Sequence, residues 1–290
     1  MTDLAAIQRG SRVVARFTVP DRTSEGFPIP RPLTLDLRIG TADQFNENDW
    51  AARAKHIPAP DIAEAQAIYE IPAVEWKGKD AIVGVRVTAG NGKQSGWSNF
   101  VVVHVVPAPA TPELAPPSAT PQGVKLTWRA AGSDFRVLRK AENGEYAAVA
   151  ETTSPEWTDG GVEFGKHYSY RVQSILKFDS DHQAESDLSA EASITPIDTF
   201  APAVPAGVHA DVAPASIELT WERNMEPDLA GYRIYRSIAN GAFEKVADVS
   251  AAPSYSDRTV EHGKTYRYAV TSVDRAGNES ERSPAVQAAW

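Results

Sequence analysis

Apolar and polar residues alternate with a period of two in several short runs of the chain. The run Val124–Trp128 has apolar side chains at every second position, and Ile217–Trp221 repeats this arrangement. The runs Tyr168–Val172 and Tyr266–Val270 alternate in the same way. Successive side chains of a strand point to opposite faces, so each run predicts a strand with one core face and one solvent face. The pattern therefore predicts antiparallel, all-β structure.

These runs recur at the spacing of a small domain. Trp128 and Trp221 are 93 residues apart, and Tyr168 and Tyr266 are 98 residues apart. A β-sandwich of the immunoglobulin type takes about 100 residues. We therefore expect residues 107–290 to hold two copies of one sandwich.

Residues 1–106 fit the same template more loosely. A stretch of alternating apolar residues near the N-terminus matches the strand that ends at Trp128, with Phe17 in the place of the tryptophan. An insertion over residues 41–62 contains Trp50 and has no counterpart in the other copies. The sequence therefore predicts a divergent first sandwich.

Helical periodicity is weak throughout the chain. The two segments that favour a short helix are Asp49–Lys55 and Asp61–Ile68, both in or beside the insertion. The expected fold class is therefore all-β, with three tandem immunoglobulin-like sandwiches.

Prolines mark the boundaries between the expected modules. They are Pro107, Pro109, Pro112, Pro116, Pro117 and Pro121 in one stretch, and Pro196, Pro202 and Pro205 in the other. Because proline fixes φ and favours extended backbone, we expect semi-rigid joints with small contacts between modules. The expected domains are residues 1–106, 107–196 and 197–290.

The chain resembles a tandem of fibronectin type III domains. Three features carry the resemblance: the tryptophan early in modules 2 and 3, the strand Tyr232–Ile234, and a Gly-Lys-x-Tyr-x-Tyr-x-Val strand in both modules. The segments 226–237 and 273–280 are also similar to bacterial members of this family.

The resemblance implies seven strands in each module, in two sheets packed face to face. It further implies that Trp128 and Trp221 fill the core and that Tyr168 and Tyr266 each make a corner hydrogen bond. Phe17 takes the tryptophan position in the first module.

Charge and composition exclude several classes of function. The net charge of −9 lies in residues 107–290, and an acidic chain without a basic stretch argues against a nucleic-acid partner. The chain has no cysteine, so disulfides and cysteine-based metal sites are excluded. The longest apolar run, residues 100–106, is too short to span a bilayer. Strand-like sequence begins almost at once, so we expect any export signal or lipid anchor to have been removed upstream.

Motifs for catalysis are missing from the sequence. The six histidines have no ligand spacing, and there is no serine-nucleophile elbow, phosphate-binding loop or dinucleotide fingerprint. The run 179–182, Asp-Ser-Asp-His, is the one compact group of metal-ligand residues. It lacks the glycine and terminal glutamate of a Ca²⁺ loop, which favours a solvated acidic tip. We therefore expect no catalytic residue, cofactor or metal.

Trp50, Trp97 and Trp157 lie outside the core pattern, the first two in the first module. Trp50 belongs to the insertion, and Trp97 precedes the last expected strand of the first module. An exposed tryptophan can stack on a sugar or anchor a protein contact, so these two are the candidate partner-binding residues. The alternative is that they cover the end of the sandwich, with Trp50 compensating for the missing core tryptophan.

Modular sandwiches without a reaction centre favour a non-catalytic function. The leading hypothesis is a monomeric spacer or interaction scaffold of the bacterial cell envelope or extracellular space, with an unknown protein or glycan partner. Such a chain would be the mature part of a surface lipoprotein. The alternative hypothesis is an accessory fibronectin type III region of a polysaccharide-active extracellular enzyme.

Overall fold

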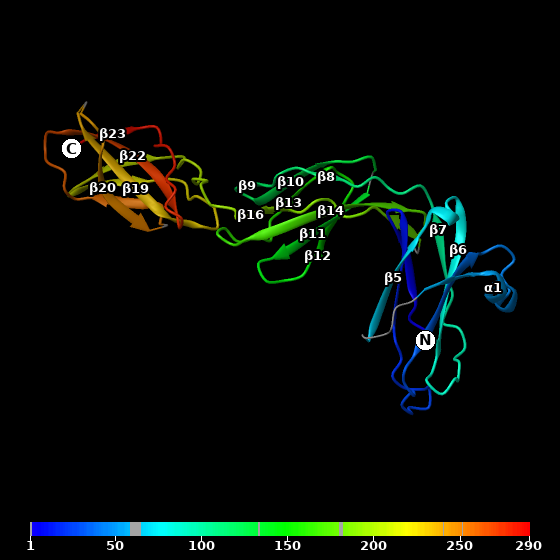
Figure 1. Ribbon diagram of the computed structural model, residues 1–290. Helices are drawn as coiled ribbons and strands as arrows, with labels where there is room; N and C mark the ends of the chain where they lie inside the picture. The colour runs from blue at the N-terminus through cyan, green and yellow to red at the C-terminus, as the bar shows by residue number, and fades with distance from the viewer. Residues whose placement is uncertain (1, 59–64, 133, 180–181, 240, 251) are drawn as a thin grey trace. The chain divides into compact units, whose positions relative to one another are not determined.

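The computed structural model describes residues 2–58, 65–132, 134–179, 182–239, 241–250 and 252–290. Part of the insertion and part of the second expected helix lie outside these ranges, as do the two central residues of the 179–182 run. Strands are the main regular elements of the described part (Figure 1). Three hydrophobic cores follow one another along the chain, which confirms the fold class of three tandem all-β sandwiches.

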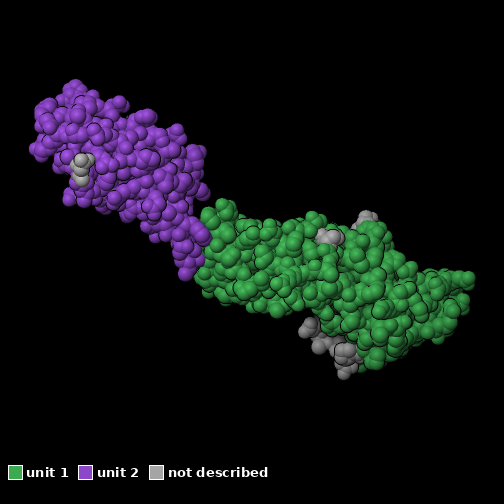
Figure 2. Space-filling model, turned by 90° about the horizontal axis from the view of Figure 1, so that it is seen from above, with its two compact units in different colours: residues 1–196 green, residues 197–290 purple. Residues whose placement is uncertain are grey.

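The chain divides into two compact units, residues 1–196 and residues 197–290 (Figure 2). The first unit holds two sandwiches, here called modules 1 and 2, and the second unit holds module 3. The domain boundaries at residues 106 and 196 remain predictions. In the described ranges, no helix has both the length and the apolar character needed to cross a membrane.

The described part of module 1 contains two sheets, a short α-helix and a 3-10 turn. The first sheet contains β1 (Ala5–Arg9), β2 (Arg12–Thr18) and β5 (Gln66–Pro72), and the second contains β4 (Lys55–Ile57), β3 (Thr34–Thr41), β6 (Lys79–Thr88) and β7 (Val101–Val105). The helices are α1 (Glu47–Arg53) and the 3-10 turn η1 (Val74–Trp76). Phe17 is buried between the sheets and stacks on Tyr69 at a centroid distance of 5.8 Å.

One of the two expected helices is wrong where the structure describes it. The first forms as α1, starting two residues earlier than expected. Residues 61–64 of the second expected helix lie outside the described residues, and residues 66–68 belong to β5, in which every second residue is buried. Alternating burial against β2 outweighs the weak helical spacing of that segment.

Modules 2 and 3 repeat this two-sheet arrangement. In module 2, β8 (Glu113–Leu114), β9 (Ser118–Thr120), β10 (Gly123–Arg129) and β13 (Glu156–Asp159) face β12 (Ala147–Thr152), β11 (Asp134–Ala141), β14 (Tyr168–Lys177), β15 (Gln183–Glu185) and β16 (Ala192–Ile194). In module 3, β17 (His209–Ala213), β18 (Ser216–Thr220) and β21 (Ser254–Asp257) face β20 (Glu244–Ser250), β19 (Leu229–Ile238), β22 (Thr265–Asp274) and β23 (Val286–Ala289). Two short pieces of module 2, β8 and β9, both pair with β10, and prolines at 116 and 117 interrupt them because proline cannot donate to the ladder.

Modules 1 and 2 share one continuous sheet. Strand β1 pairs in parallel with β15, with Gln8 opposite Ala184 and Arg9 opposite Glu185. The combined sheet runs β12-β11-β14-β15-β1-β2-β5. The expectation of small contacts is therefore wrong at this joint. Both β1 and β15 are edge strands of their own sandwiches, and their unpaired backbone groups bond each other.

Candidate functional site

Helix α1 places Trp50 against the second sheet of module 1. The Asn46 side chain caps the helix by accepting hydrogen bonds from two backbone N–H groups of the first turn. Trp50 is 3% exposed, and its ring meets those of Trp97 and Phe100 edge to face at 5.3 and 5.0 Å. A Cβ on Gly40 would lie 2.8 Å from the Trp50 indole nitrogen, so a glycine is needed for this close approach. Trp50 therefore points inward and offers no exposed ring to a partner.

Trp97 is the half-buried member at the edge of the aromatic cluster of Trp50, Trp97 and Phe100. The guanidinium carbons of Arg86 and Arg38 lie 4.4 and 5.7 Å from its ring centroid, an arrangement that favours cation–π attraction. Both arginines also bond Asp36. Burial raises the pKa of Asp36, but the hydrogen bonds from Arg38 and Arg86 outweigh it, and the pKa is lowered overall. The two predicted residues thus lie together, and only Trp97 is within reach of solvent.

The Trp50→Ala variant should destabilise module 1 by about 3–5 kcal/mol, because a buried indole is replaced by a cavity. Urea unfolding followed by the fluorescence of the remaining tryptophans measures this. Val74→Ala, at a side chain 75% exposed, is the matched control and should change little. A Trp50→Ala chain as stable as the wild type would contradict the role of Trp50 as a cover of module 1.

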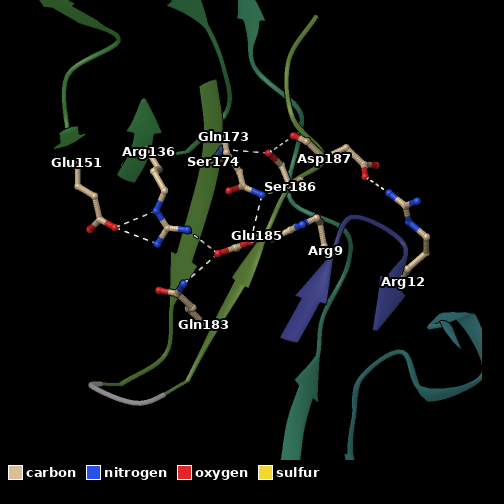
Figure 3. Close-up of polar contacts among 10 residues, drawn as sticks. All are labelled: Arg9, Arg12, Arg136, Glu151, Gln173, Ser174, Gln183, Glu185, Ser186 and Asp187. Carbon is tan, nitrogen blue, oxygen red and sulfur yellow. Dashed lines mark hydrogen bonds and ion pairs between the residues drawn. The ribbon is translucent and has the colours of Figure 1, made fainter. Parts of the chain in front are cut away.

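The joint between modules 1 and 2 contains a buried carboxylate. Glu185 of β15 is 3% exposed and lies between arginines of the two modules (Figure 3). Arg9 from module 1 donates to Oε2 at 2.9 Å, and Arg136 from module 2 donates to Oε1 at 2.6 Å. Gln173 adds a hydrogen bond of 3.1 Å from its side-chain amide. Burial raises the pKa of Glu185, but the bonds from the two arginines outweigh it, and the pKa is lowered overall.

Further polar contacts extend the joint on both sides of Glu185. Arg12 forms an ion pair with Asp187 (Figure 3), and the backbone N–H of Gly10 donates to the Glu185 carbonyl at 2.7 Å. Gly10 has a φ of +57°, and a Cβ there would lie 2.4 Å from the Asp187 carboxylate. The buried Gln8 side chain bonds the backbone of Val106, the last residue before the proline stretch. Charge pairing and backbone pairing together fasten module 1 to module 2.

The residues singled out as a core signature occupy equivalent places in modules 2 and 3. Trp128 and Trp221 are 5% and 6% exposed, and each meets an aromatic ring edge to face. The Tyr168 hydroxyl accepts a hydrogen bond from the backbone N–H of Glu163 at 3.0 Å. Tyr266 accepts one in the same way, from a residue five positions upstream, at 2.8 Å. These are the corner hydrogen bonds that the resemblance implies.

Comparison with known proteins finds relatives that match parts of the chain. No family model matches the chain. Exoglucanase B of Cellulomonas fimi is 30% identical over 188 residues, which cover 62% of this chain and 17% of that protein. An amylopullulanase of Thermoanaerobacterium saccharolyticum is 38% identical over 87 residues, 30% of this chain and 7% of that protein. The chain thus spans less than a fifth of either relative.

A solved two-domain fibronectin type III segment of chicken tenascin is 18% identical. It covers 63% of this chain, and this chain covers 99% of it, with a TM-score of 0.39. Within the chain itself, the strand pairing repeats in each module, and the corner tyrosines hold their places in modules 2 and 3. The chain has the fold of a tandem of fibronectin type III domains.

All three fibronectin type III domains share a Ser-x-x-Ser element that sequence reasoning missed. The second member of each pair, Ser98, Ser189 or Ser283, accepts a hydrogen bond through its hydroxyl from a backbone N–H of the neighbouring long strand. The first members are Ser95, Ser186 and Ser280. Each accepts a hydrogen bond from the backbone N–H group two residues further along the same strand. These bonds hold the irregular chain between the last two strands against the sheet. The repeat of Ser-x-x-Ser at the domain spacing is the signal that could have revealed it.

A buried ion pair joins the two sheets in domains 2 and 3. In domain 3, Arg236 donates to Asp257 at 2.8 Å, and the Tyr268 hydroxyl donates to the same carboxylate at 2.8 Å. Arg139, Asp159 and Tyr170 form the same triad in domain 2. Burial and the adjacent carboxylate raise the pKa of Tyr268. Asp159 and Asp257 are 98 residues apart, the same spacing as the two tyrosine strands, so the repeat was visible in the sequence. The residues next to each aspartate gave no indication that its side chain is buried.

Proposed function

We propose that this chain is a non-catalytic spacer and interaction region of an extracellular bacterial protein, and that it accompanies the catalytic part of a polysaccharide-active enzyme. The observation that carries the proposal is the joint between domains 1 and 2. A shared sheet and the doubly paired Glu185 hold two domains in one body, and a spacer that sets a distance or an angle needs such a joint.

The relatives support the enzyme-associated form of this proposal. Their names are exoglucanase and amylopullulanase, both glucan-cleaving activities, and the matched stretch is only 17% and 7% of those proteins. A region that is so small a part of each enzyme, and whose fold is built from repeated sandwiches, fits an accessory role. In this proposal the chain is exported, acts as a monomer and has no nucleic-acid partner.

The buried acids support a non-catalytic role. In the described part of the chain the buried carboxylates belong to Asp159, Glu185, Asp257 and Asp274, and each accepts hydrogen bonds within the fold. Glycoside hydrolysis needs a general acid with a raised pKa. The pKa of both Glu185 and Asp257 is lowered overall, so these groups stay ionised and act as structural ion pairs.

The cell-envelope scaffold is the second candidate, and the aromatic rim of domain 1 favours it. Trp97 is half-buried, and the neighbouring Phe45 is 42% exposed. These rings could contact a protein or glycan beside the arginine pair that flanks Trp97. In this version the chain would be tethered to the surface by a lipid anchor.

Detection of the native polypeptide tests the proposal. Antibodies raised against this chain should recognise, in the culture medium of the organism that makes it, a polypeptide larger than this 290-residue chain. Immunoprecipitates of that polypeptide should release reducing sugar from a β- or α-glucan, whereas the 290-residue chain alone should not. A membrane-anchored polypeptide without glucan hydrolysis would favour the scaffold instead. Release of sugar by the chain alone would overturn the non-catalytic role.

A further inference from the structure

Two histidines from different domains meet beside the joint. His104 lies on β7 of domain 1, and His182 lies just before β15 of domain 2, next to Asp179 in the same loop. The imidazole rings are edge to face with centroids 4.9 Å apart. One ligand atom from each of His104, His182 and Asp179 lies within 4.8 Å of the other two. Sequence reasoning considered the loop alone and had no means of adding His104.

The arrangement around these side chains is that of a metal centre with an outer shell. The Asp80 carboxylate contacts the Nδ1 atom of His104, which fixes the ring and leaves the Nε2 atom to bind a metal ion. Metal-bound histidines commonly hold a carboxylate on their second nitrogen in this way. The Asp179 carboxylate lies 2.9 Å from the Nδ1 atom of His182, close to the separation of two ligand atoms on one metal ion. Both rings are partly open to solvent, with side chains 34% and 38% exposed, so an ion can reach them.

We propose that His104, His182 and Asp179 bind a divalent transition metal, Zn²⁺ by preference, with water as the fourth ligand. Two imidazoles and a carboxylate form a donor set that suits zinc, whereas Ca²⁺ and Mg²⁺ prefer oxygen ligands alone. Ligand atoms of a tetrahedral zinc site lie about 3.3 Å apart, since each bond is about 2.0–2.1 Å. Small rotations of exposed side chains close the present separation of up to 4.8 Å.

The metal would act as a second fastening between domains 1 and 2. One ligand comes from domain 1 and two come from domain 2, so an ion held by all three binds the pair tightly only when the domains are docked. The site lies next to the β1–β15 pairing and would add a metal-dependent contact to it. It stands independently of the proposed spacer function, because it depends only on residues within the unit of residues 1–196.

Calorimetric titration of the tag-free 290-residue chain with ZnCl₂ tests this site. The wild type should bind one equivalent of Zn²⁺. His104→Ala and His182→Ala should each bind more than about 100-fold more weakly, since even an outer-shell change costs about 10–100-fold. Asp80→Asn should fall within that outer-shell range. His167→Ala is the matched control, because His167 lies in domain 2 and its ring contacts the Thr195 hydroxyl, apart from the proposed site.

A second measurement keeps the result independent of folding. Co²⁺ should give the visible absorption of a four-coordinate nitrogen and oxygen site in the wild type and in His167→Ala, and not in His104→Gln. Circular dichroism must show that each variant keeps the wild-type fold. Failure of the wild type to bind Zn²⁺ would overturn the proposal. Equal binding by His104→Ala would also overturn it, because domain 1 would then contribute no ligand.

Discussion

Trp221→Ala should unfold domain 3 at a much lower urea concentration than the wild type and leave residues 1–196 unchanged. Trp221 is 6% exposed and packs edge to face on Tyr232 at 5.0 Å, so its loss leaves a large cavity that costs about 3–5 kcal/mol. Domain 3 forms a compact unit of its own, which confines the effect. Hydrogen exchange read out by mass spectrometry assigns the lost protection to residues.

The matched variant is Trp128→Ala in domain 2. It removes an equivalent indole, 5% exposed, but its domain shares a sheet with domain 1. In Trp128→Ala, the loss of hydrogen-exchange protection should therefore spread into β1. In Trp221→Ala, β1 should keep its protection. Trp221→Phe should cost less than Trp221→Ala, since no group in the described ranges accepts the indole N–H of Trp221. Equal loss of protection across all three domains in Trp221→Ala would contradict the two-unit organisation.

Glu185→Gln should destabilise the unit of residues 1–196 by about 2–3 kcal/mol and loosen its joint. Removing one partner of a fully buried pair costs about 3–5 kcal/mol, and we expect less because the Arg9 side chain is 41% exposed. Thermal unfolding measures the loss. Glu151→Gln is the control: Glu151 bonds the same Arg136, but its side chain is 47% exposed and should contribute little.

The joint should also weaken in acid. The pKa of Glu185 is lowered in the folded chain, so its contribution is present above the unfolded pKa of about 4.3. That contribution is lost as the pH falls through the folded pKa. Glu185→Gln should remove this part of the pH dependence. A variant with the same acid profile as the wild type would show that Glu185 does not stabilise the joint.

The fold class was predictable because each strand carries its own signal. Alternation around Trp128 and Trp221 depends only on neighbouring residues, since one face of each strand is buried. The helix at Trp50 was also expected from local spacing, and in the structure an asparagine cap and an acidic first turn favour it. The helix expected over residues 61–68 was wrong at residues 66–68, because a short apolar run fits both periods and pairing with β2 decides between them.

The joint and the histidine cluster were not predictable from the sequence. Pairing of β1 with β15 joins residues some 175 positions apart, and nothing near either strand marks it as a partner of the other. His104 and His182 are likewise distant in sequence. Asp179 lies near His182 in the chain, but no other ligand lies near His104 in the sequence. The inward position of Trp50 depends on two glycines that let the indole approach the sheet, an effect that single-sequence patterns do not show.

The central claim is that domains 1 and 2 form one body. The chain has no cysteine, so Ile68→Cys and Ala148→Cys place two unique spin labels. They lie on β5 and β12, at the opposite ends of the shared sheet. Pulsed electron spin resonance should give one narrow distance distribution, which should broaden in Glu185→Gln. A broad distribution in the otherwise wild-type chain would contradict the claim, because it would mean that the two domains move independently.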